Sequence, residues 1–118
     1  MKLSRITVMV RDIDKTVMFY RELAGLTVIQ RFNPGRGEIA IMADSSGDTA
    51  LEFAQIIEAE KVQARGLTLS FQVRGPLEAV RDKAVELGWS PSEIIRRPPR
   101  PAHFVIADPD GVRVVFSR

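Results

Sequence analysis

Apolar and polar residues alternate in two short segments of the chain, and the two segments lie 63 positions apart. In residues 5–10 and 68–73 every second side chain is apolar: Ile6, Val8 and Val10 in the first segment, then Leu69, Phe71 and Val73 in the second. A period of two is typical of a strand with one buried face. Because the pattern returns at a fixed offset, we predict two repeated modules that each begin with such a strand.

A helical pattern follows each alternating segment and ends at a glycine, Gly25 in the first module and Gly88 in the second. Before each glycine the apolar side chains recur at roughly helical spacing: Ile13, Val17, Tyr20 and Leu23, then Leu77, Val80, Ala84 and Leu87. Asp12 or Asp14 can cap the first helix, and Pro76 suits the first turn of the second. The pattern therefore predicts one helix in each module, with a glycine at its C-terminal end.

Turn-forming residues divide the rest of each module into strands. Residues 43–47 (Ala-Asp-Ser-Ser-Gly) resemble residues 107–111 (Ala-Asp-Pro-Asp-Gly), and both precede an apolar segment. We predict strands at these positions: 3–10, 26–32, 37–43, 49–56, 66–73, 89–96, 102–107 and 112–117. Pro91 interrupts the sixth of them, and the prolines within residues 96–101 predict a loop.

These elements define two tandem βαβββ modules, residues 1–58 and 64–118. We expect the modules to form one α+β domain over residues 1–118. Its sheet would be cupped and mostly antiparallel, with the helices on the outer face and the more polar face of the strands inside the cup. Any ligand would then lie in the cup.

Composition excludes several classes of protein. The chain has no cysteine, so disulfides and thiolate metal sites are absent, which fits the cytoplasm. No apolar stretch approaches the ~20 residues of a spanning helix. The net charge of +2 is distributed as −2 over residues 1–60 and +4 over residues 61–118. This excess is too sparse for a nucleic-acid binder but could attract small anions. We expect no nucleic-acid or membrane partner.

Three short motifs resemble those of a known family. They are Val10-Arg11-Asp12-Ile13-Asp14, Phe19-Tyr20-Arg21-Glu22-Leu23-Ala24-Gly25-Leu26 and Asp108-Pro109-Asp110-Gly111. Together with the internal repeat, they make the whole chain similar to the vicinal oxygen chelate superfamily, which includes glyoxalase I, bleomycin-resistance proteins and extradiol dioxygenases. The resemblance implies the fold predicted above and a homodimer. It does not determine the chemistry.

The resemblance also implies where a divalent metal ion would bind. The family's usual ligands are a His or similar residue on the first strand of each module and a Glu or similar residue on the last. The matching positions here are Arg5 and Thr68, then Glu52 and Val115. Only Glu52 is a typical ligand, because arginine offers no lone pair and valine has no donor atom. We therefore expect no metal and no cofactor, and hypothesise that an Arg5–Glu52 ion pair has replaced the metal.

Strand alternation predicts which side chains face the cup and are candidates for ligand binding: Arg5, Thr7, Glu52, Thr68, Ser70, Gln72, Arg113 and Val115. Arg5 and Arg113 together could hold an anion; the alternative is that they are ordinary charges at a sheet end or dimer contact. His103 is the single histidine, so no two-His metal site can form. No catalytic residue is identified.

The favoured function is a metal-independent protein of this superfamily that binds a small organic molecule, neutral or anionic, in the sheet cup. The alternative is a glyoxalase-like lyase or isomerase with a degenerate or metal-free site. A third interpretation is a structural or regulatory partner domain. Metal content separates the first two interpretations, because one bound ion per chain would favour the enzyme.

Overall fold

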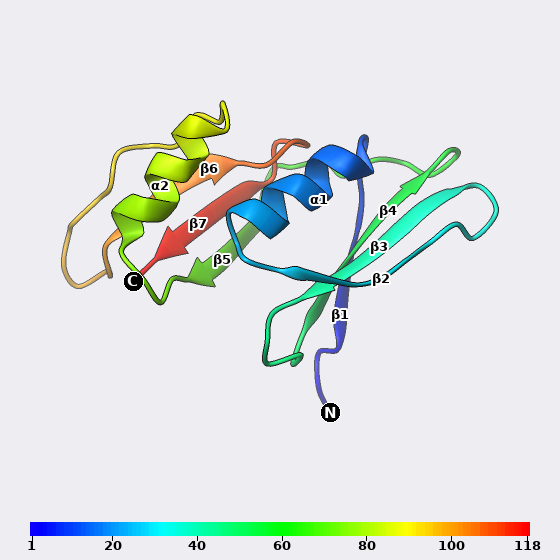
Figure 1. Cartoon of the computed structure of the whole chain (residues 1–118), viewed down its shortest axis with the longest axis horizontal. Coiled ribbons are helices and arrows are strands. Elements are labelled where there is room, and N and C mark those ends of the chain that lie inside the picture. The colour runs from blue at the N-terminus through cyan, green and yellow to red at the C-terminus, as the bar shows by residue number, and fades with distance from the viewer. The chain divides into compact units, whose positions relative to one another are not determined.

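The computed structural model describes residues 1–118 and divides into two compact units, Met1–Gln63 and Ala64–Arg118. Each unit combines one helix with one open sheet of parallel and antiparallel strands (Figure 1). The predicted α+β class is therefore confirmed, whereas the grouping of both units into one domain stays a prediction. Neither of the ten-residue helices is long and apolar enough to span a membrane.

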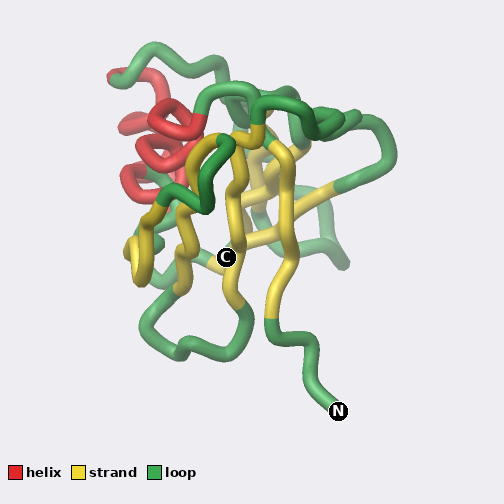
Figure 2. Tube along the Cα trace, turned by 90° about the vertical axis from the view of Figure 1, so that its right-hand side faces the viewer, coloured by secondary structure: helices red, strands yellow, loops and turns green.

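The first unit contains a four-stranded sheet in the order β1-β4-β3-β2. Its strands have these bounds: β1 (Arg5–Met9), β2 (Thr27–Phe32), β3 (Gly37–Ala43) and β4 (Ala50–Ile56). Strand β1 runs parallel to β4, and the other neighbours are antiparallel. The first and last strands of the module thus lie side by side. Figure 2 shows the residues before β1 as a loop that leads away from the strands to the N-terminus.

Helix α1 (Ile13–Glu22) packs against β2, β3 and β4. The Asp12 side chain caps it by accepting a hydrogen bond from the backbone N–H of Lys15. On the buried face of α1 the Tyr20 ring stacks on Phe53 of β4, with ring centroids 4.7 Å apart. Because side chains alternate along a strand, Glu52 next to Phe53 points to the sheet face away from α1.

The second unit contains a three-stranded sheet in the order β5-β7-β6 and a second helix. Its elements have these bounds: β5 (Thr68–Gln72), α2 (Leu77–Glu86), β6 (His103–Ala107) and β7 (Arg113–Ser117). Strand β5 runs parallel to β7, as β1 does to β4. The buried Phe116 ring stacks on Phe71 and Phe104, with centroids 5.6 Å and 5.2 Å away. This aromatic cluster is part of the core of the unit, together with the buried Leu77, Ile106 and Val114.

The strand predicted over residues 89–96 is wrong. The segment makes a single bridge to β6, between Ile95 and His103. Three residues before Ile95, the Ser92 backbone N–H donates to the Val105 carbonyl. The Val105 N–H donates in return to the Ser92 hydroxyl, where a regular ladder would have a backbone carbonyl. Pro91 has no N–H to donate, so the chain follows the edge of β6 without a regular ladder. The predicted loop over residues 96–101 is confirmed.

Candidate functional site

The register of the first sheet places three of the predicted site residues on one face. In the parallel β1–β4 pair, Arg5 lies opposite Ala50, and Thr7 lies opposite Glu52. Ile41 of β3 flanks Glu52 on its other side. Glu52 is therefore on the face that points away from α1, with Thr7 directly beside it and Arg5 two residues before Thr7 on β1.

Both carboxylate oxygens of Glu52 accept hydrogen bonds from β1. The Arg5 guanidinium Nη1 donates to Oε2 at 3.1 Å, and the Thr7 hydroxyl donates to Oε1 at 2.8 Å. The Glu52 side chain is 15% exposed and that of Arg5 is 50% exposed. The ion pair hypothesised from the sequence is thus present, and Thr7 joins it. A charge-assisted bond of this kind stabilises an otherwise uncompensated, largely buried carboxylate.

Apolar side chains that the sequence-based set did not include share the face with Glu52. Ile39 and Ile41 of β3 lie opposite Ala54 and Glu52 of β4. Phe32 of β2 lies opposite Ile39, and 37% of its surface is exposed. Alternation within β3 was the signal that could have identified the two isoleucines. This face of the sheet therefore carries one ion pair next to apolar side chains of β2 and β3.

In the second unit the predicted residues also share one face. Thr68 lies opposite Arg113 and Ser70 lies opposite Val115, so all four point to the same side as Gln72. The Arg113 guanidinium donates one hydrogen bond, to the Thr68 hydroxyl at 3.3 Å, and forms no ion pair. An exposed guanidinium has five N–H donors, so most of the donors of Arg113 face solvent.

The two units place an arginine on the same rung of equivalent strand pairs, but from opposite strands. Arg5 on β1 faces Ala50 on β4, whereas Arg113 on β7 faces Thr68 on β5. Two residues further along the last strand, Glu52 of the first unit is replaced in the second by Val115. Only the first arginine therefore has a carboxylate beside it.

The residues at the family's metal positions do not suit a divalent cation. Glu52 already accepts from Arg5 and Thr7, and Val115 has no donor atom. No group of three or more His, Cys, Asp or Glu side chains in the molecule could hold a metal ion. The single histidine, His103, is buried in the second sheet, where its Nδ1 lies 3.0 Å from the Pro101 carbonyl oxygen. A divalent site needs three or four lone-pair donors, which these positions lack.

The repeated strand–helix–strand units, with their first and last strands parallel and adjacent, define the chain as a paired-module α+β protein. More narrowly, the chain belongs to the glyoxalase/bleomycin resistance protein/dioxygenase superfamily, because the model of that family matches residues 2–116. The resemblance inferred from the motifs is thus confirmed.

Solved structures with the same fold are similar to this chain at low sequence identity. The crystal structure of SMU.1112c has 19% identity and a TM-score of 0.79, covering 100% of this chain and 98% of its own. TnmS3, an antibiotic binding protein from Streptomyces sp. CB03234, has 19% identity and a TM-score of 0.78, covering 99% of this chain and 94% of its own. A glyoxylase/bleomycin resistance protein/dioxygenase domain from Frankia sp. EAN1pec has 16% identity and a TM-score of 0.79, covering 99% of this chain and 96% of its own. No curated protein matches the chain significantly.

Proposed function

We propose that this protein binds a small organic molecule without a metal ion, on the sheet faces that carry Glu52 in the first unit and Val115 in the second. The ligand-binding set is the one expected from the sequence: Arg5, Thr7, Glu52, Thr68, Ser70, Gln72, Arg113 and Val115. The proposal includes a homodimer, which comes from the family resemblance, and a cytoplasmic location, which comes from the absence of cysteine.

One observation carries the metal-free part of the proposal: both Glu52 oxygens are hydrogen bonded within the protein, to Arg5 and Thr7. A cation would have to displace a guanidinium whose charge is permanent and repels it. The remaining family positions would then contribute at most the hydroxyl of Thr68. We infer that the ion pair occupies the electrostatic role that a metal ion has in metal-dependent relatives.

The chemistry of the two faces, each taken by itself, supports an organic ligand, because one face offers apolar surface and the other offers hydrogen-bond donors. In the first unit, Ile39 and Phe32 offer apolar surface, whereas Ile41 beside Glu52 is buried. In the second unit, Arg113 offers unused donors and Thr68 a hydroxyl. A guanidinium favours carboxylates and phosphates and repels cations. TnmS3, which has this fold, is an antibiotic binding protein, so an antibiotic is one kind of organic molecule to test here. The preference for an anionic or neutral ligand comes from the exposed guanidinium of Arg113.

A thermal-shift and titration panel tests this proposal. The panel contains benzoate and 2-naphthoate, the matching amides, and the matching amines, each added to protein that has been dialysed against a chelator. We expect the naphthalene compounds to raise the melting temperature more than the benzene ones, and the carboxylates more than the amines. Stabilisation by the amines alone, or binding that appears only after a divalent metal is added, would overturn the proposal and favour a metal-dependent enzyme.

The oligomeric state is tested separately by equilibrium sedimentation at micromolar concentration. A molecular mass of twice the chain's 13.2 kDa is expected for the homodimer. A monomer at that concentration would remove the dimer from the proposal and leave the ligand-binding part standing.

A further inference from the structure

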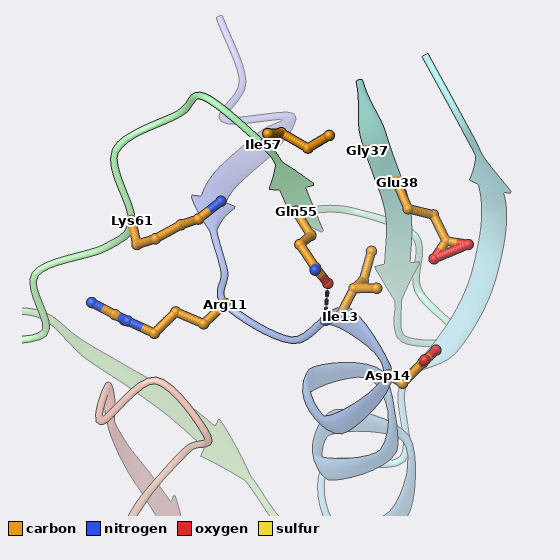
Figure 3. A pocket seen from close by; sticks show the side chains of 8 residues that line it. All are labelled: Arg11, Ile13, Asp14, Gly37, Glu38, Gln55, Ile57 and Lys61. Carbon is orange, nitrogen blue, oxygen red and sulfur yellow. Dashed lines mark hydrogen bonds between the residues drawn. The ribbon is translucent and has the colours of Figure 1, made fainter. Parts of the chain in front are cut away.

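The first unit has a pocket on the other side of its sheet, at the N-terminal end of α1 (Figure 3). Its volume is about 390 Å³, and it is lined by residues of α1, β3, β4 and the segments next to them: Arg11, Ile13, Asp14, Gly37, Glu38, Gln55, Ile57 and Lys61. Gln55 lies opposite Glu38 in the β3–β4 ladder, and it is three positions after Glu52 on the same strand. Since side chains alternate, the pocket lies on the face opposite to the site proposed above.

One side of the pocket is rich in hydrogen-bond donors. The Lys61 ammonium donates to the Ile56 carbonyl at 2.6 Å, which leaves further N–H groups available. The Gln55 Oε1 accepts from the backbone N–H of Ile13 at 2.8 Å (Figure 3), so its amide nitrogen is left without a protein partner. Arg11 lies beside Lys61 on the same side (Figure 3). These groups together suit a carboxylate.

The other side of the pocket is acidic. Asp14 and Glu38 point toward each other (Figure 3), and both accept from Nη2 of Arg31, at 2.5 Å and 2.6 Å. The hydrogen bond to Glu38 raises the pKa of Arg31 above its ordinary value, and the hydrogen bond to Asp14 contributes to the same shift to a smaller extent. Each carboxylate uses one oxygen in this way, and one guanidinium against two carboxylates leaves a net negative charge. The second Glu38 oxygen suits an ammonium group.

We infer that this pocket is a second binding site, for a small zwitterion of the amino-acid type. Its carboxylate would lie against Lys61 and the Gln55 amide, and its ammonium against Glu38. A simple anion would gain the first contact but face two carboxylates, and a simple amine would meet Lys61 and Arg11. Only a molecule with both charges satisfies both sides, while Ile13 and Ile57 provide apolar surface for the chain between them.

The test is an NMR titration of the full-length, isotope-labelled protein with a series of ω-amino acids: glycine, β-alanine, 4-aminobutanoate and 5-aminopentanoate. Each is compared with the carboxylate and the amine of matching chain length. We expect shifts at the backbone amides of residues 11–14, 37–38 and 55–61. One member of the series should bind at least about tenfold more tightly than either single-charge analogue.

Matched variants make the test specific. Lys61→Met and Glu38→Gln should each weaken binding of that zwitterion by roughly fivefold or more. Gln55→Glu keeps an acceptor for the Ile13 N–H but removes the amide donor, so it should weaken binding of the carboxylate end. The controls Lys2→Met and Glu58→Gln remove the same charges from exposed positions outside the pocket.

Equal binding of the zwitterion and its single-charge analogues would overturn the inference. So would shifts confined to the opposite sheet face, or pocket variants that behave like the controls. If Glu38→Gln does not fold because its ion pair with Arg31 is lost, Lys61→Met and Gln55→Glu still decide the outcome. The inference does not depend on the ligand proposed for the Glu52 face.

Discussion

The Arg5 guanidinium donates to the Glu52 carboxylate at 3.1 Å, although the two residues lie 47 positions apart in the chain. The pair exists because β1 and β4, the first and last strands of the module, run parallel and adjacent. In relatives that use a metal, the same two positions are where ligands are expected. The protein therefore stabilises the Glu52 charge with its own side chain.

A double-mutant cycle measures the strength of this ion pair. Arg5→Met, Glu52→Ala and the combined variant should give a coupling free energy of roughly 1 kcal/mol, because the Arg5 side chain is half exposed and solvent screens the pair. Urea unfolding followed by circular dichroism provides the free energies. The exposed Lys2–Asp48 pair, at 4.0 Å, is the control and should show almost no coupling. If the coupling free energy of Arg5 and Glu52 were as close to zero as that of the control pair, the Arg5–Glu52 contact would not be formed in solution.

Arg113 should affect ligand binding without affecting stability. Its one bond is to the Thr68 hydroxyl and its side chain is exposed, so Arg113→Met should change the free energy of unfolding by less than about 0.5 kcal/mol. The same variant should lose most of the stabilisation by 2-naphthoate, whereas Arg113→Lys should retain part of it, since a lysine keeps the charge but not the fork of donors. Thermal shift with 2-naphthoate and with its amide provides the measurement. An unchanged response to 2-naphthoate would exclude Arg113 from the ligand site.

Arg31 should contribute to stability because it joins two elements. It bonds Asp14 of α1 and Glu38 of β3 at once, and 32% of its side chain is exposed. Arg31→Met should therefore lower the free energy of unfolding by roughly 1 kcal/mol. As a control, Arg36→Met removes a pair with Glu58 in which both side chains are about 70% exposed, so its effect should stay within about 0.5 kcal/mol. Chemical unfolding of both variants measures whether the stability depends on the double pairing of Arg31 with Asp14 and Glu38. If the two variants lost the same free energy of unfolding, the loss of one positive charge would explain both effects.

Much of the first unit's candidate site could be predicted because it depends on strand periodicity and on the strand arrangement that the family resemblance implies. Alternation assigns Arg5, Thr7 and Glu52 to one face, and the family resemblance brings the first and last strands together. The 63-residue offset assigns the equivalent face within the second unit, where Thr68 indeed lies opposite Arg113. Patterns of this kind repeat along the chain, so they can be read without knowing the three-dimensional structure.

Other features depend on contacts that leave no periodic signal. The segment at residues 89–96 is irregular because Pro91 and the Ser92 hydroxyl change its hydrogen bonding to β6. The pocket beside α1 requires Gln55 of β4 to meet the backbone N–H of Ile13, which are 42 positions apart. Side chains from separate elements meet there only after folding, and neither residue belongs to a motif.

Metal content tests the central claim most directly. Protein purified without chelators and then dialysed against micromolar zinc, nickel, manganese and iron should carry no stoichiometric metal by mass spectrometry, and Glu52→Gln should give the same result. In the folded protein, Arg5 and Thr7 already donate hydrogen bonds to both oxygens of the Glu52 carboxylate. One tightly held ion per chain that disappears in Glu52→Gln would contradict the account, because it would show that the carboxylate serves a metal and not the guanidinium.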